Sequence, residues 1–448
     1  MLTRVCLIVV LLVATSLWSQ VVGNGAGIGS TSQAGDEDRM LTPSPVDIQG
    51  YSVALGSETR SNYLRTGVAF RSEYNDNFYT GVSGNPVSDM SYSIWPTIAL
   101  DETTPRLRSM LTYSPSLTFY QHSNTPTQLD QIVRANLQYR MSPHMTLSLQ
   151  DNLARTSNAF TLLNPASVTV AGSIQAPTTP LMFAVGSGDL LSNTAAGEFT
   201  YQFTASNMVG ASGAFNDVHY PNPLRVQGLN DSTYTAGSAF YTRRVLKKHY
   251  LGATYLYQKI LTYPTAGQGE TQTNGALLFY TTHLTSRVSV SVSGGIQHSE
   301  YIQVPSLPVQ TWSPAGAASI GWQGVHTTFA VAGSRTISGG GGLVGAYHLI
   351  TANGSVRRQL TRTWSTSISG SYSLSKNVDS SQLLFNPGGH SVAGAAAVHH
   401  VLSEHFNVEV GYARIHQSYI GIAAIVNVPD TNRGWISISY QFIRPLGK

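Results

Sequence analysis

The stretch Trp364-Ser-Thr-Ser-Ile-Ser-Gly-Ser-Tyr-Ser-Leu374 alternates between two kinds of side chain. Its even positions carry mostly apolar residues, and its odd positions are serine. Strict alternation places every second side chain on one face of a β-strand. A face made of serines cannot form a protein core, but it can line a water-filled lumen while the apolar face meets lipid. The pattern therefore predicts a transmembrane β-barrel.

The same alternation recurs from about residue 60 onward, in strands of roughly 10–17 residues. We expect an all-β fold, a transmembrane antiparallel up-and-down β-barrel of about 18 strands, with 16 as the lower bound. The expected strands cover residues 64–80, 88–101, 105–121, 129–141, 144–157, 193–204, 207–219, 232–243, 249–262, 271–283, 286–301, 312–322, 325–336, 344–359, 363–377, 391–402, 405–419 and 433–443.

The connections between these strands are alternately short and long. Leu284-Thr285 and Gln323-Gly324 are short, whereas 158–192 and 378–390 are long. Outer-membrane barrels have tight periplasmic turns and longer outer loops, and an even strand number places both termini in the periplasm. We expect the longest loop, 158–192, to fold into the lumen as a constriction.

The N-terminus predicts export. A short charged segment ending at Arg4 precedes an apolar run from Val5 to Val13, which is typical of a signal peptide. We expect residues 1–23 to be the signal peptide, 24–60 a flexible periplasmic leader and 61–448 the barrel. Cys6 is the only cysteine, so the mature chain is expected to have no disulfide. The net charge of +4 is too small to indicate nucleic-acid binding.

Charged side chains fall on the polar face of the expected strands, as a barrel requires, because a charge that faces lipid at mid-depth costs about 2–4 kcal/mol. Two residues do not fit a regular strand with one polar and one apolar face. Pro115 removes one hydrogen bond from its ladder. Asp151 falls on the apolar face unless a β-bulge resets the register. In the last strand, Tyr440 and Phe442 share the apolar face and look like the closing-strand signal that the outer-membrane assembly machinery recognises.

The string Tyr74-Asn-Asp-Asn-Phe78, the stretch from Leu111 to Asn124 and the hairpin from Leu137 to Thr156 resemble the β-barrel porins often encoded near exopolysaccharide-export and exosortase genes. The resemblance covers most of the chain after residue 60. It implies an outer-membrane barrel that passes polysaccharide or other solutes. It supplies no catalytic residues.

The sequence offers few candidates for a catalytic or metal-binding site. No nucleophile elbow, zinc-protease helix or phosphate loop is present, and we expect no catalytic, cofactor-binding or metal site. His399 and His400 are adjacent and so point to opposite faces of a strand. Asp217 and His219 share a face near the outer rim and are the best enzymatic lead, although solvated rim polarity is the simpler interpretation.

Arginines on neighbouring strands are the strongest functional candidates. A basic arc in the lumen would favour anions, because rings of Arg or Lys select anions. The alternative is that these arginines pair with Glu73, Asp101 and Asp130, or bind lipopolysaccharide and periplasmic phosphates. The candidates are Arg65, Arg71, Arg106, Arg108, Arg134 and Arg140.

The sequence thus favours a non-enzymatic outer-membrane channel for passive passage of solutes or an extracellular polysaccharide, with a mildly anion-favouring lumen. The alternatives are a structural or adhesive surface barrel and a barrel enzyme with a rim active site. The expected partners are outer-membrane lipid and lipopolysaccharide, the barrel-assembly machinery, and anionic solutes or polysaccharide, without nucleic acid. The permeant solute and the oligomeric state are left open.

Overall fold

The computed structural model describes eleven segments of the chain. The predicted signal peptide, the predicted leader and most of the loop 158–192 lie outside them, so the expected constriction by that loop stays a prediction. The described segments are residues 62–78, 86–122, 127–156, 189–221, 230–263, 268–285, 287–303, 309–338, 346–378, 388–419 and 430–445.

These segments form eighteen β-strands, the number expected from the alternation. Their bounds are β1 (Asn62–Asn75), β2 (Asp89–Thr103), β3 (Leu107–Tyr120), β4 (Gln128–Ser142), β5 (Met145–Thr156), β6 (Leu190–Thr204), β7 (Asn207–His219), β8 (Asp231–Leu246), β9 (His249–Tyr263), β10 (Gly269–His283), β11 (Val288–Gln303), β12 (Val309–Gln323), β13 (Thr327–Ser338), β14 (Tyr347–Gln359), β15 (Trp364–Asn377), β16 (Gly389–Val401), β17 (Phe406–Tyr419) and β18 (Asp430–Pro445).

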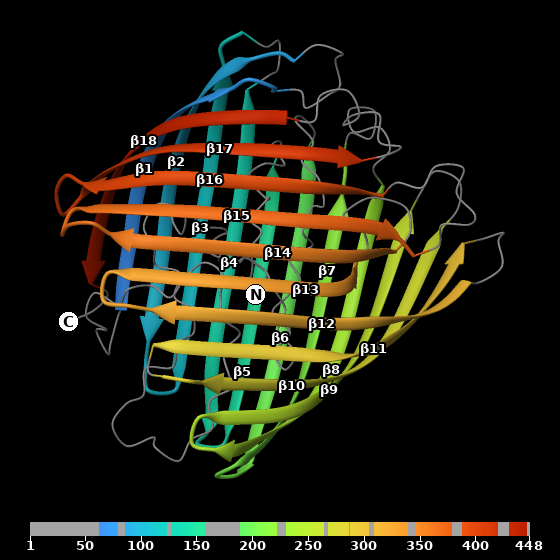
Figure 1. The fold of residues 1–448 in the computed structure, drawn as a ribbon. Helices are drawn as coiled ribbons and strands as arrows, with labels where there is room; N and C mark the ends of the chain where they lie inside the picture. The colour runs from blue at the N-terminus through green and yellow to red at the C-terminus, as the bar shows by residue number, and fades with distance from the viewer. Residues whose placement is uncertain are drawn as a thin grey trace, which may run out of the picture.

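The strands form one closed antiparallel sheet. Each strand pairs with the next in the chain, and β1 pairs with β18 from Tyr63↔Pro445 to Asn75↔Arg433. The first residue of β1 and the last of β18 therefore lie at the same end of the barrel. The tight turns lie at this end as well, which we call the short-turn end (Figure 1). Its opposite is the long-loop end. The predicted up-and-down barrel is confirmed.

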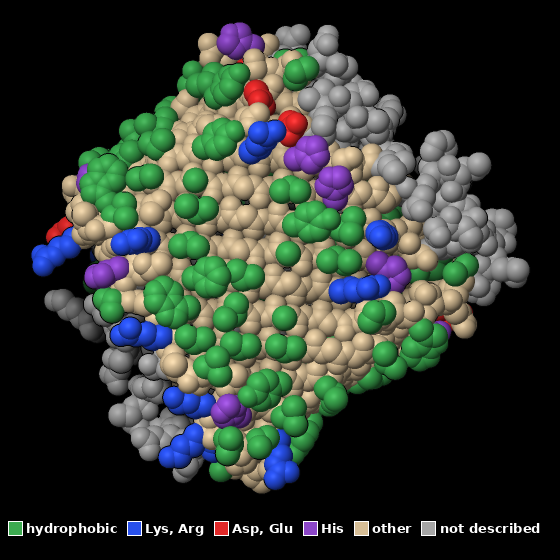
Figure 2. Space-filling view, in the orientation of Figure 1, with side chains coloured by type: hydrophobic (Ala, Val, Ile, Leu, Met, Phe, Trp, Pro, Cys, Tyr) green, Lys and Arg blue, Asp and Glu red, His purple; other side chains and the backbone are tan. Residues whose placement is uncertain are grey.

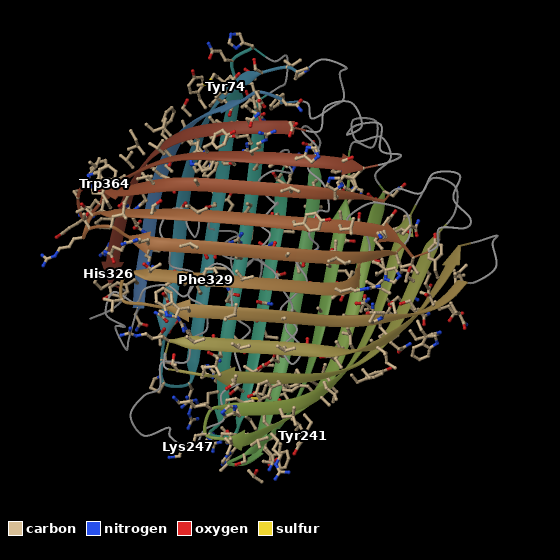
Figure 3. The ribbon with its side chains drawn as sticks, viewed as in Figure 1. Tyr74, Tyr241, Lys247, His326, Phe329 and Trp364 are labelled. Carbon is tan, nitrogen blue, oxygen red and sulfur yellow. The ribbon has the colours of Figure 1, made fainter. Side chains whose placement is uncertain are left out.

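The two faces of the wall differ as the alternation predicts. On β15, the outward Trp364 and Ile368 are exposed, whereas Ser375 on the inner face is 1% exposed. Apolar side chains are distributed across the outward surface over β12–β18 (Figure 2). Tyr74, Tyr241 and Trp364 are among the exposed aromatic residues (Figure 3).

Prolines interrupt one ladder. The pairing of β2 with β3 is lost between Ile94↔Leu117 and Ile98↔Tyr113. In this register Pro115 lies opposite Pro96, and neither residue has an N–H to donate. Two hydroxyl contacts join the two strands on either side of the proline pair, Ser93 to Thr118 at 2.8 Å and Thr97 to Ser114 at 3.2 Å.

Asp151 faces outward with no bulge to redirect it. It lies between Ala135 on β4 and Ala195 on β6 in unbroken registers, and the only register shift between β4 and β5 falls at Arg140/Ser142. The side chain is exposed. No bulge resets the register here, so Asp151 lies on the outward face, as the alternation alone places it.

Candidate functional site

Four of the predicted arginines lie on the inner face of one part of the wall. The register runs Arg65↔Ala99, Ala99↔Thr112 and Thr112↔Arg134, so Arg65 on β1 and Arg134 on β4 share a row. Arg108 and Arg140 have the same strand parity and project inward nearer the short turns. Arg106 instead lies in the exposed turn before β3, where its carbonyl accepts the Arg140 N–H at 2.7 Å.

The partners of these arginines differ. Arg65 forms an ion pair with Asp101 at 3.6 Å, as the alternative interpretation expected. Arg134 donates from Nε to the neutral amide oxygen of Asn152 at 3.2 Å. For Arg108 and Arg134, no carboxylate pairs with the guanidinium among the described residues. Their charges therefore act on the lumen without a neutralising partner.

Arg71 lies nearer the long-loop end and belongs to a different cluster. Its guanidinium stacks over the Trp435 ring at 4.6 Å and the Trp95 ring at 5.6 Å. It also pairs with Glu73 at 2.5 Å. Glu73 accepts a second bond from Arg433 Nε at 2.6 Å, so the carboxylate is shared between two guanidinium groups. The alternative interpretation, in which the arginines pair with nearby carboxylates, thus describes Arg71 as well as Arg65.

A glycine makes room for Trp435 in this cluster. Gly411 lies directly opposite Trp435, and a Cβ added at Gly411 would stand 2.2 Å from the indole ring. The ring therefore lies flat over the glycine, and its Nε1 donates to Glu409 at 2.7 Å. Gly210 with Phe240 and Gly252 with Phe279 repeat the arrangement on the inner wall.

The Tyr74–Phe78 string pins the closing seam between β1 and β18. The expected first strand runs to residue 80, but β1 ends at Asn75. Asp76 then accepts bonds from the Asn432 backbone N–H at 2.7 Å and from its Nδ2 at 2.6 Å. Phe78 is buried and packs against the Tyr120 ring at 4.6 Å. The string thus ties the first strand to the last.

A corner of the wall folds inward at the long-loop end. Gln258 on β9 donates from Nε2 to the Ile337 carbonyl on β13 at 3.2 Å, although three strands separate β9 from β13. Ile337, Tyr347 and Leu349 are buried at this end of the β13–β14 hairpin. Two parts of the wall that are distant in the sheet are therefore joined directly.

Pro314 explains why the corner can form. The β12–β13 ladder stops at Gly316↔Arg335, whereas β12 continues beside β11 to Val309 (Figure 1). The Ala317 N–H points toward β11, where it donates to Ser293 Oγ at 3.2 Å. Because N–H direction alternates along a strand, the nitrogen of Pro314 faces β13 and cannot donate. Continuing the register would place Pro314 opposite Ile337, whose carbonyl bonds to Gln258 instead.

His219, which was considered together with Asp217 as a catalytic pair, contacts a different aspartate in the structure. Asp217 and His219 both face outward near the long-loop rim, but His219 Nδ1 lies 2.6 Å from Asp231 Oδ2 on β8. Asp231 also accepts the Tyr220 N–H at 2.8 Å. The pair is solvent-exposed, and no serine, threonine or cysteine is hydrogen-bonded to the imidazole among the contacts found in the described ranges.

His399 and His400 point to opposite faces. His400 stacks outward on Trp364 at 4.1 Å, and His399 lies opposite Glu409 on the inner side. Within the described residues, no group of three or more His, Cys, Asp or Glu side chains could hold a metal ion. That part of the chain also contains no helix long and apolar enough to cross a membrane.

Tyr440 and Phe442 are exposed on the outward face of β18, where Tyr440 packs against Phe406 at 5.0 Å.

Comparisons with known proteins give fold-level matches only. No family model and no curated protein matches the chain. Among solved structures, the chain is similar to Pseudomonas aeruginosa OpdK with vanillate, at 10% identity over 85% of this chain and 99% of that one, with a TM-score of 0.41. It is also similar to Pseudomonas aeruginosa OccK2 (OpdF), at 9% identity over 86% and 98%, with a TM-score of 0.42. Acinetobacter baumannii OccAB2 matches at 11% identity over 85% and 98%, with a TM-score of 0.41.

Proposed function

We propose that the protein is an outer-membrane channel through which hydrophilic solutes pass passively, with a preference for anions. The observation that carries this proposal is the division of a closed wall into two faces. The outward face presents exposed apolar side chains such as Ile368, Val410 and Ile438, which lipid would cover. The inner face presents hydroxyl, amide and guanidinium groups, which suit water and solutes.

The anion preference rests on the inner arginines without a carboxylate partner. Arg108 and Arg134 belong to this group, and Arg357 on the inner face of β14 adds a third guanidinium that pairs with no carboxylate within the described segments. Uncompensated positive charge inside a low-dielectric wall concentrates anions in the lumen. A polysaccharide that carries carboxylate or phosphate groups belongs to the same solute class. The short-turn end, with the first and last strands, would face the periplasm.

Single-channel recording tests the proposal directly. The purified protein is refolded into a planar bilayer, and reversal potentials are measured under a salt gradient. We expect steady conductance with a reversal potential that reports anion preference. A folded barrel that conducts no ions would overturn the channel function. A conducting barrel that favours cations would overturn the role of the arginines but leave the channel function standing.

A further inference from the structure

Six basic or titratable side chains form a continuous band on the outward face at the long-loop end of β13–β17. We call this band the basic rim. Blue and purple side chains gather along this edge of the outward surface (Figure 2). Its members are Arg335 on β13, His348 on β14, Lys376 on β15, His390 on β16, and Arg414 and His416 on β17.

The strand registers make these residues neighbours. His348 lies directly opposite Lys376, and Arg335 is diagonal to His348 because Ile337 pairs with His348. Lys376 is diagonal to His390, which pairs with Leu374. The same offset brings the His390 ring to 5.6 Å from the His416 ring. Diagonal neighbours in a sheet stand about 7–8 Å apart, so a single anionic group can reach two or three of them.

Most of the positive charge on this rim has no protein partner. Arg414 and His416 both contact Asp430 Oδ1 at 3.2 Å. Arg335 and Lys376 are exposed, and neither pairs with a carboxylate within the described ranges. Three Arg or Lys residues less one aspartate leave a net charge of +2 before any histidine is protonated.

Over β7–β11 the long-loop rim has the opposite character. Asp217, Asp231, Glu270 and Glu300 face outward on β7–β11. Lys259 forms an ion pair with Glu270 at 2.8 Å, and His219 contacts Asp231. The positive charge of the basic rim is therefore not continued over β7–β11, which argues against a basic girdle around the whole barrel.

The depth of the band indicates what it binds. Two residues nearer the middle of each strand, the outward face becomes mostly apolar at Ile350, Leu374, Val392 and Tyr412. A ligand on the rim would thus hold its anionic group beside the side chains of the basic rim and its apolar body against the wall below. We propose that the basic rim is a binding site for the phosphate groups of a membrane lipid headgroup. This proposal rests on the proposed placement in the membrane.

Lipid retention tests the site. The full chain is reconstituted in phosphatidylcholine nanodiscs that contain either bisphosphorylated or monophosphorylated lipid A, and native mass spectrometry counts the lipid A that stays bound after detergent extraction. The test variant is Arg335→Gln with Lys376→Gln. Arg358→Gln with Arg155→Gln is the matched control, because both residues are outward-facing and exposed but lie away from the basic rim.

We expect the native protein to retain the bisphosphorylated lipid and the test variant to retain it about fivefold less for each charge removed, since each basic residue near an anionic surface contributes about 1 kcal/mol. The control variant should retain it fully. Equal losses in both variants, or equal retention of both lipids, would overturn the proposal. Displacement by millimolar inorganic phosphate would do so as well, because it would assign the site to a soluble anion. Conductance of the same samples reports separately on the channel function.

Discussion

At the scale of single residues, the inner wall depends on glycines that make space for rings. Gly411 is the clearest case, since any Cβ there would collide with Trp435. We expect Gly411→Val to push the indole away from Glu409 and Arg71 and to lower the free energy of unfolding by about 1–3 kcal/mol. Urea titration of the refolded barrel, followed by tryptophan fluorescence, measures this. Gly394→Val is the control, because nothing lies within 4 Å of its added Cβ. Equal effects of the two variants would contradict the argument.

Asp76 shows how one side chain can close a barrel. Its carboxylate accepts hydrogen bonds from both the backbone N–H and the side-chain amide of Asn432, which follows it by 356 positions in the chain. We expect Asp76→Ala to lower the free energy of unfolding by about 1.5–3 kcal/mol, because hydrogen bonds to a charged group are lost at the seam. Heat-modifiable mobility on a gel, read against urea concentration, measures the change. Glu102→Ala, at the other end of the wall, should leave the midpoint in place. A stable Asp76→Ala barrel would mean that the ladder alone holds β1 to β18.

At the scale of elements, Pro314 determines where β12 and β13 separate. We expect Pro314→Val to restore the missing donor, to extend the ladder beyond Gly316↔Arg335 and to release the Ile337 carbonyl from Gln258. Amide hydrogen exchange at Thr336–Ser338 should slow by at least about tenfold, which corresponds to one hydrogen bond of roughly 1.4 kcal/mol. Trp312→Val is the control, since Trp312 already has its N–H. Unchanged exchange in Pro314→Val would show that the corner is set by packing alone.

The elements also show what the sequence could and could not predict. Alternation predicted about eighteen strands because side-chain parity is a local property, and the eighteen strands of the structure include β15 where the alternation is clearest. The loss of a ladder hydrogen bond at Pro115 was predicted correctly. That Pro96 lies opposite Pro115 could not be predicted, because it depends on the register between the two strands. The contact between Gln258 and Ile337 spans three strands, so no local pattern reports it. Asp151 faces outward, where the alternation places it in the absence of a bulge.

At the scale of the whole molecule, the lumen charge is a balance between arginines and distant carboxylates. The sequence placed Arg65 and Arg71 in one basic arc, but folding brings Asp101 to the first and shares Glu73 between Arg71 and Arg433, 360 residues after Glu73. Only the contact between Arg433 and Glu73 follows from closure of the barrel. Glu73 lies on the same strand as Arg71, and Asp101 lies on the strand next to Arg65, so the sequence could name both carboxylates as possible partners. Among the arginines of the predicted arc, the uncompensated charge that remains lies on Arg108, near the short turns, and on Arg134, near the middle of β4.

This distribution makes selectivity a property of particular positions. We expect Arg134→Glu to reduce the anion preference severalfold or to invert it, because the new carboxylate replaces an unpaired positive charge on the inner wall. Reversal potentials under a salt gradient measure the change, and high salt should weaken it through screening. Arg155→Glu makes the same change in charge on the adjoining strand β5, but on the outward face. If both variants shifted the selectivity equally, the permeating ions would be responding to the total charge of the barrel. A shift in Arg134→Glu alone would place them in the lumen.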